Sequence, residues 1–134
     1  MRPMYLLDTS TVSLALRGRA PAAVERLRTT KRESVAVSVV TAMELRFGIA
    51  KNPSTRVRAV VEQFLDTVQV LPIDRAVEKP YGDLRAALER LGRPIGALDT
   101  IIAAHALAVR AVLVTNNLRE FRRVRSLRCE DWTT

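Results

Sequence analysis

The sequence predicts an α/β protein whose parallel sheet is covered by helices on both faces. Short apolar runs such as Met4–Leu7, Val35–Val39 and Ala111–Thr115 alternate along the chain with longer segments of helical periodicity. Strands that are buried on both faces have such unbroken apolar sequences, whereas half-solvated strands alternate apolar and polar residues. The chain has 134 residues, of which 48% are hydrophobic, and this is enough for one compact core. We therefore expect a single domain over residues 1–134.

The strand Met4–Leu7 is followed by two predicted helices. Thr11–Arg17 forms the first of them and ends at Gly18, a residue that readily terminates a helix. Ala20–Lys31 forms the second, which has an amphipathic pattern and places Pro21 in the first turn, where a backbone N–H is not needed. This region therefore links the first two strands through helices.

The middle of the chain continues the alternation. Val35–Val39 is short and rich in valine, which favours a strand. Thr41–Ala50 has a helical pattern, and Pro53 separates it from a second helix at Thr55–Thr67. Val68–Ile73 then has the composition of a third strand.

The C-terminal part adds helices around two further strands. Ala76–Leu91 has an apolar period of 3.6 residues, and Ala97–Val109 is an alanine-rich helix. Ala111–Thr115 is a buried strand, and a short helix at Leu118–Arg122 follows it. Leu127–Trp132 is predicted as an edge strand.

The charge of the chain indicates a polyanionic partner such as nucleic acid. The net charge is +8 and the pI is about 10.9. Almost all of the positive charge is arginine, because lysine occurs only at positions 31, 51 and 79. The arginine guanidinium forks onto phosphate oxygens, which suits a nucleic acid backbone. A basic surface that is merely solvated is the alternative.

Nothing in the sequence indicates a membrane segment or export. No apolar run approaches the roughly 18 residues of a transmembrane helix. Asp8 interrupts the only apolar stretch near the N-terminus, so we expect no signal peptide. The single cysteine, Cys129, excludes a disulfide framework and a cysteine zinc site. We therefore expect the protein to work in the cytoplasm.

Three carboxylates in apolar surroundings predict a metal site. Asp8 follows the apolar run MYLL, Glu44 lies in VVTAMELRFG, and Asp99 lies in IGALDTIIAAHALAV. The carboxyl ends of parallel strands share one edge of a sheet, so Asp8 and the turn Thr115–Asn117 belong together there. Asp99 opens the helix that leads into the same strand. A divalent cation relieves the repulsion among such acids, and oxygen ligands favour Mg²⁺ or Mn²⁺ over Zn²⁺.

Each acid also has a local structural interpretation. Asp8 can cap the helix that follows it, and Asp99 can be a first-turn acid favoured by the helix dipole. Thr41-x-x-Glu44 and Asn117-x-x-Glu120 both fit capping boxes. Three further residues are interpreted as structural: His105 as a packed or surface histidine, Cys129 as an inert thiol, and Trp132 as a packing anchor.

Four segments of the chain resemble a known family. MYLLDTS, SVVTAMELRFG, IGALDTIIAAHALA and LVTNNLREFRRV…LRCEDW are similar, in order and spacing, to the PIN-domain ribonucleases. Within that family they most resemble the VapC toxins of type II toxin–antitoxin (VapBC) systems. The resemblance implies a three-layer α/β/α PIN-like fold with a four- to five-stranded parallel sheet. It also implies Mg²⁺- or Mn²⁺-dependent endonucleolytic hydrolysis of RNA.

The resemblance implies a set of site residues. The first three acids of the family correspond to Asp8, Glu44 and Asp99. Asp8 and Asp99 would hold the metal, and Glu44 would bind a second metal or position a water molecule. The position of a frequent fourth acid is occupied by Asn117, which can ligate through its carbonyl oxygen, while Glu120 could supply the charge. The supporting residues are Ser10, Thr115 and Asn116.

The resemblance also implies partners. The substrate would be RNA, in particular the anticodon loop of initiator tRNA. A small VapB-type antitoxin would inhibit the toxin by placing an arginine near the carboxylates. The protein would form a homodimer, or a hetero-oligomer with its antitoxin.

Three alternatives stay open at this stage. A phosphatase of the haloacid-dehalogenase type also begins with an Asp at a strand end, but it needs a second Asp where this chain has Ser10. A catalytically weak PIN-like module could bind RNA or a partner without cutting, and Asn117 in place of an acid favours it. A DNA-directed nuclease of the same fold is the third alternative.

Overall fold

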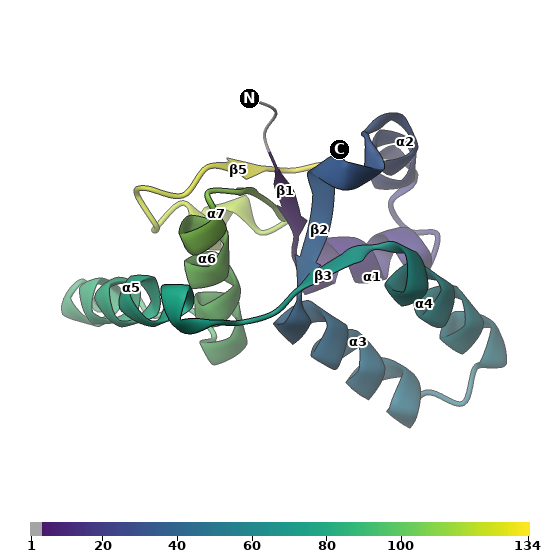
Figure 1. Cartoon of the computed structure of the whole chain (residues 1–134), viewed down its shortest axis with the longest axis horizontal. Helices are drawn as coiled ribbons and strands as arrows, with labels where there is room; N and C mark the ends of the chain where they lie inside the picture. The colour runs from purple at the N-terminus through teal and green to yellow at the C-terminus, as the bar shows by residue number, and fades with distance from the viewer. Residues whose placement is uncertain (1–3) are drawn as a thin grey trace.

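The computed structural model describes residues 4–134 and has a five-stranded parallel sheet between two groups of helices (Figure 1). The strand order is β3-β2-β1-β4-β5. The strands are β1 (Tyr5–Leu7), β2 (Val35–Ser38), β3 (Gln69–Leu71), β4 (Val112–Val114) and β5 (Cys129–Glu130). The predicted α/β class and parallel sheet are therefore confirmed.

Seven α-helices connect and cover these strands. They are α1 (Thr9–Leu16), α2 (Pro21–Thr29), α3 (Val39–Lys51), α4 (Thr55–Thr67), α5 (Glu78–Arg90), α6 (Ala97–Val109) and α7 (Leu118–Phe121). Short 3₁₀ turns, η1 (Arg32–Ser34) and η2 (Arg75–Val77), precede β2 and α5. Within residues 4–134, no helix is both long and apolar enough to cross a membrane.

The two faces of the sheet carry separate hydrophobic cores. Because side chains alternate along a strand, Leu6 and Leu7 of β1 point to opposite faces. Leu6 packs in the core formed with α5, α6 and α7, and Leu7 packs in the core formed with α1 to α4. In Figure 1 the first group of helices lies to the left of the sheet and the second to the right. This is the predicted three-layer arrangement.

The predicted boundaries differ from the observed ones mainly at helix starts. α1 begins at Thr9, two residues earlier than predicted, because Asp8 caps it. α3 begins at Val39 rather than Thr41, because the Ser38 hydroxyl accepts a hydrogen bond from the Val40 N–H and ends β2. α5 begins at Glu78, after the turn η2. Side-chain caps set the starts of α1 and α3, and apolar periodicity alone does not locate them.

The C-terminus is anchored by packing, as predicted for Trp132. Its ring is buried and its centroid lies 5.1 Å from that of Tyr5. The guanidinium of Arg26 lies 4.8 Å from the Trp132 ring, within the range of a cation–π contact. The indole N–H donates to Glu130, which follows Cys129 in the short edge strand β5.

Candidate active site

The carboxyl edge of the sheet brings three strand ends together. Leu7 of β1 pairs with Val37 of β2 and with Val114 of β4. The next residue of each strand, including Asp8 and Thr115, therefore lies in the same row. The N–H of Asp8 donates to the carbonyl of Val114 over 2.9 Å. The chain leaves β1 towards β2 on one side and meets β4 on the other, so this edge is a topological switch point, where α/β proteins bind ligands.

Asp8 is both a helix cap and a buried charge. Its Oδ1 accepts a hydrogen bond of 2.9 Å from the Thr11 N–H, so the capping interpretation is confirmed. However, only 2% of the residue is exposed. Burial raises the pKa of the Asp8 carboxyl, while hydrogen bonds from Thr115 and Thr11 partly offset this. A cap does not need such burial, and a buried carboxylate is costly without a cation.

Glu44 reaches the same region from α3. The Thr9 hydroxyl donates to Glu44 Oε1 over 2.6 Å and lies 3.1 Å from the Thr41 hydroxyl. The capping-box interpretation of Thr41 and Glu44 is wrong, because α3 begins at Val39 and both residues lie inside the helix. They are instead held against the start of α1, one residue after Asp8. The hydroxyl of Thr9, at the start of α1, therefore orients Glu44, which lies on α3.

Asp99 shows that the acids share one electrostatic environment. It lies half-buried in the first turn of α6. Burial, together with the negative charges of Glu120, Asp8 and Glu44, raises the pKa of Asp99 to about 6. Within residues 4–134, none of these four carboxylates forms an ion pair with an arginine or lysine. The predicted convergence of acids from distant segments is therefore found.

The turn after β4 links Asn117 to Glu120. The Asn117 side-chain amide donates to Glu120 Oε2 over 3.0 Å, and the Asn117 N–H donates to the Thr115 hydroxyl over 3.0 Å. The capping-box interpretation of this pair is wrong, because the Asn117 side chain bonds a side chain and makes no cap bond to α7. Thr115 therefore connects this turn to Asp8, which it also hydrogen-bonds.

The other two supporting residues are more open. Ser10, in the first turn of α1, and Asn116, next to Thr115, are both exposed. Their side chains form no hydrogen bond within the part of the chain that the structure describes. We call the carboxyl edge of the sheet with Asp8, Glu44, Asp99 and Glu120 the acidic edge. Ser10 and Asn116 adjoin it in sequence and are free to meet a ligand there.

The donor set fits a hydrated divalent cation. Across residues 4–134, no three acidic, histidine or cysteine side chains are arranged as a complete ligand set. Mg²⁺ often takes only one or two protein carboxylates and completes its octahedron with water. The buried charge of Asp8 and the mutual repulsion felt by Asp99 are conditions that a cation relieves. These two residues are the ones that could hold Mg²⁺ or Mn²⁺.

Sequence reasoning missed the contact between His105 and Ser38. His105 is almost fully buried on α6, and its Nδ1 lies 2.8 Å from Ser38 Oγ. Burial lowers the pKa of His105, so the ring is neutral at pH 7. The packed interpretation of this histidine is thus confirmed. The contact ties the helix that carries Asp99 to the start of the helix that carries Glu44.

Cys129 is half-buried in β5. Burial raises the pKa of its thiol, which keeps it in the unreactive protonated form at pH 7. This agrees with the predicted inert cysteine.

The fold and the acidic edge together define the class of protein. The model of the PIN domain family matches residues 5–127, which is most of the chain. The chain therefore belongs to the PIN domain family, which is a family of nuclease domains.

Its relatives belong to the VapC group of that family, as the resemblance predicted. The "tRNA(fMet)-specific endonuclease VapC" of Shigella flexneri is 39% identical over 130 residues, which cover 96% of this chain and 98% of that protein. "Ribonuclease VapC2" of Rickettsia felis is 32% identical and covers 96% and 98%. The crystal structure of DNA-bound VapBC from Salmonella typhimurium superposes with a TM-score of 0.90 at 37% identity, covering 98% of this chain and 99% of the matched chain.

Proposed function

We propose that this protein is a metal-dependent endoribonuclease and the toxin of a type II toxin–antitoxin pair. The observation that carries the proposal is the acidic edge, where Asp8, Glu44 and Glu120 all raise the pKa of Asp99. Carboxylates that repel one another in a partly buried site are typical of metal-dependent phosphodiester hydrolysis. The membership of the PIN domain family supports the same chemistry.

The roles of the residues follow from their contacts. A bound Mg²⁺ or Mn²⁺ would supply a Lewis acid and a water molecule of lowered pKa. Asp8 and Asp99 would bind the ion. Glu44, whose Oε1 is held by Thr9, would orient the attacking water. Asn117 holds one oxygen of Glu120, so the other oxygen can accept a hydrogen bond from a water molecule.

A water nucleophile agrees with the composition of the site. Attack by water on phosphorus with the 3′-oxygen as the leaving group gives a 5′-phosphate and a 3′-hydroxyl end, and it needs neither the substrate 2′-hydroxyl nor a pair of histidines. The only histidine of the chain is His105, and its Nδ1 is engaged with Ser38 away from solvent. No second acid–base histidine is available to support another mechanism.

The proposed substrate is a single-stranded tRNA loop, with the initiator tRNA anticodon loop as the first candidate. The support comes from two relatives, of Shigella flexneri and Salmonella typhimurium, that are named tRNA(fMet)-specific endonucleases and are 39% and 38% identical to this chain. Splayed bases and exposed phosphates of a loop can enter a site that a duplex cannot. The cytoplasm remains the proposed compartment, because that is where tRNA is used.

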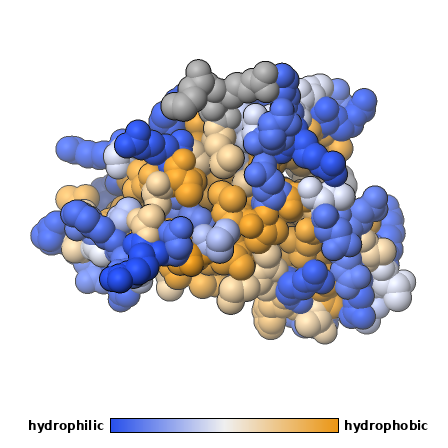
Figure 2. All heavy atoms as spheres, viewed as in Figure 1, coloured by the Kyte–Doolittle hydropathy of each residue, from blue (hydrophilic) through white to orange (hydrophobic). Residues whose placement is uncertain are grey.

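The proposed protein partners are a VapB-type antitoxin and a second copy of the chain. Structures of VapBC complexes from three bacteria superpose on it with TM-scores of 0.85 to 0.90. Met43 and Phe47, which lie on α3 beside Glu44, are 64% and 65% exposed. Figure 2 shows hydrophobic surface across the middle of the face on which β3 and α3 lie in Figure 1. Such surface is unfavourable in water and favours a protein partner.

Expression in a bacterium tests the proposal. We expect growth arrest on induction, together with new 5′-phosphate RNA ends at one tRNA position, detected by sequencing these ends. Asp99→Asn serves as the matched control, because it keeps the shape of the side chain and removes the charge. If the purified chain binds tRNA but releases no product with Mg²⁺ or Mn²⁺, the catalytically weak module favoured by Asn117 replaces the proposal.

A further inference from the structure

A hollow lined by arginines lies on the segments that lead into Asp99 and surround Glu120 in sequence. Its volume is about 420 Å³, and its lining residues are Arg93, Arg119, Arg122 and Arg123. Arg93 comes from the loop between α5 and α6, and the other three come from α7 and the two residues after it. We refer to this site as the arginine hollow.

The guanidinium groups of the arginine hollow are not neutralised by the protein. Within residues 4–134, none of the four has a carboxylate at ion-pair distance. The nearest acid in sequence, Glu120, is bonded by Asn117 instead. Four positive charges therefore face one space, and this favours the binding of an anion.

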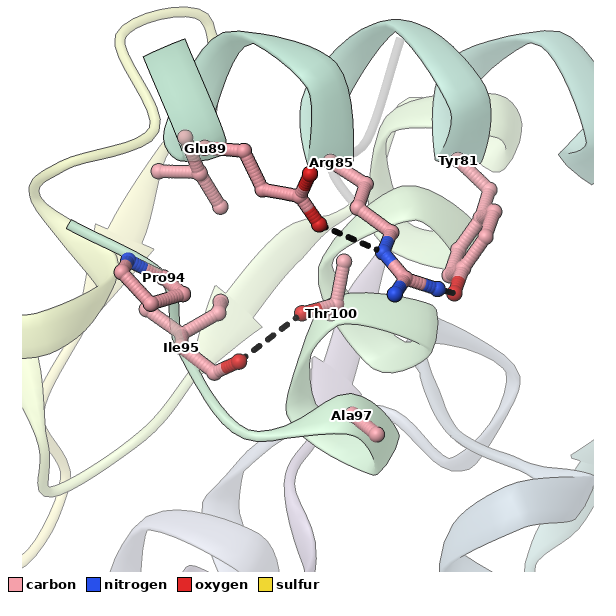
Figure 3. Close-up of a pocket in the computed structure, with 8 residues that line it drawn as sticks. Tyr81, Arg85, Glu89, Pro94, Ile95, Ala97 and Thr100 are labelled. Carbon is pink, nitrogen blue, oxygen red and sulfur yellow. Dashed lines mark hydrogen bonds and ion pairs between the residues drawn. The ribbon is translucent and has the colours of Figure 1, made fainter. Parts of the chain in front are cut away.

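A neighbouring cavity shows what a neutralised arginine looks like in this protein. Arg85 lies in a cavity of about 130 Å³ between α5 and the start of α6. Its Nε donates to Glu89 and one terminal nitrogen donates to Tyr81, each over 3.0 Å (Figure 3). That guanidinium is used within its own helix. In the hollow, within the described part of the chain, only Arg123 forms a side-chain hydrogen bond, to a backbone carbonyl, so the guanidinium groups of Arg93, Arg119 and Arg122 are available to a ligand.

One contact fixes the base of the hollow. Arg123 donates to the Pro94 carbonyl over 3.2 Å and so joins the α7 segment to the loop before α6. The same two segments carry two of the four acids, since the loop runs into the first turn of α6 with Asp99, and Arg119 adjoins Glu120. The arginine hollow is thus built on the elements that position Asp99 and Glu120.

We propose that the arginine hollow binds backbone phosphates of the RNA next to the bond that is cut. This inference rests on the proposed function and adds the site that holds the substrate. Guanidinium groups bind phosphate oxygens through paired hydrogen bonds, and these contacts position a strand without reading its sequence. The acidic edge repels the RNA backbone, so an adjacent basic site is needed to hold the strand in place. The hollow supplies it.

The test compares two matched pairs of substitutions. Arg119→Gln/Arg122→Gln removes two of the four charges of the hollow but keeps Arg123, which bonds Pro94. Arg32→Gln/Arg110→Gln removes the same charge before β2 and β4, at the opposite edge of the sheet. Affinity for a labelled tRNA anticodon stem-loop is measured without divalent cation at several salt concentrations, so that no cleavage occurs.

We expect the hollow pair to weaken binding about tenfold more than the control pair. The slope of log K against log salt should fall by about 1.4, since each single-strand phosphate contact contributes about 0.7. In cleavage assays KM should rise while kcat stays within about twofold. Arg93→Gln, on the other wall, should give a smaller loss in the same direction.

Equal affinities for the hollow pair and the control pair would overturn the inference. A fall in kcat at unchanged KM would overturn it as well, because it would assign these arginines to the chemistry rather than to RNA binding. If the unsubstituted chain cleaves tRNA in either case, the proposed function stands without the hollow. If the unsubstituted chain neither binds nor cleaves tRNA, both proposals fail.

Discussion

The acidic edge and the arginine hollow are two clusters of like charge that share two segments, the start of α6 with the loop before it and the α7 region. The acidic edge is partly buried, and burial together with like charge raises the pKa of Asp99 to about 6. The arginines lie mostly at the surface, where water screens their repulsion. Clustering alone therefore does not define a reactive site. Because the acids are partly buried, their negative charges need a cation to offset the repulsion. The mostly exposed arginines are already screened by water, so an anion adds favourable contacts without being required.

The largest expected effect comes from removing charge at the acidic edge. Asp8→Asn and Asp99→Asn should each lower kcat by more than about 100-fold, because they remove proposed metal ligands and not merely outer partners of such ligands. The measurement is tRNA cleavage with Mg²⁺, with circular dichroism to check folding. Arg119→Gln is the control from the arginine hollow and should change KM instead. An acid variant with unchanged kcat would contradict the assignment.

The second effect concerns the group that orients Glu44. Thr9→Val should lower kcat about tenfold, since it removes the hydroxyl that donates to Glu44 but keeps the shape of the side chain. Thr29→Val is a matched control, because the Thr29 hydroxyl bonds only backbone carbonyls of its own helix. Equal activity of the two variants would show that Glu44 needs no such support.

The third effect is a pH dependence of stability that arises at the acidic edge and not in the arginine hollow. The folded chain keeps a proton on Asp99 up to about pH 6, whereas the unfolded chain releases it near the ordinary value of 3.8. The free energy of unfolding should therefore fall as pH rises through this window in the absence of metal. Mg²⁺ should raise the melting temperature more at pH 8 than at pH 5, because protons compete with the ion at low pH.

Asp99→Asn is the matched control for this pH dependence. Its unfolding free energy should change less between pH 4 and pH 6, as measured by denaturant titration at each pH. The same pH dependence in both proteins would show that Asp99 is not the group responsible.

The smallest effect is expected at the contact that joins the two acid-bearing helices. Ser38→Ala removes the cap of α3 and the partner of His105, and should lower the unfolding free energy by about 1 kcal/mol or slightly more. Ser54→Ala, which removes the cap of α4, is the control. It should cost a similar free energy but leave kcat unchanged, whereas Ser38→Ala should also lower kcat. Equal kcat in both variants would show that the contact between Ser38 and His105 contributes to stability only and does not position the acids.

The fold was predictable because the central strands β1, β2 and β4 are buried on both faces. The side chains of Leu6 and Leu7 enter different cores. A strand that is buried on both faces needs consecutive apolar residues, and this pattern can be recognised in the sequence. The edge where the acids meet followed from the same pattern, since Asp8 comes directly after a strand. The start of α3 was predicted two residues late, because a serine cap leaves little trace in apolar periodicity.

The contacts within the site were less predictable. Thr9 and Glu44 are 35 positions apart, and Ser38 and His105 are 67 positions apart. The local sequence predicts capping boxes that would use Glu44 and Glu120, and the structure forms neither of them. Long-range hydrogen bonds depend on how the helices pack, and no local pattern encodes that packing.

The double use of Asp8 limits how the protein can lose its activity. The carboxylate starts α1 and also supplies charge at the sheet edge, so most replacements would damage the helix and the reaction together. Asp99 has no cap to maintain, and its removal relieves repulsion. Inactive but well-folded descendants of this protein are therefore expected to have changed at position 99 far more often than at position 8.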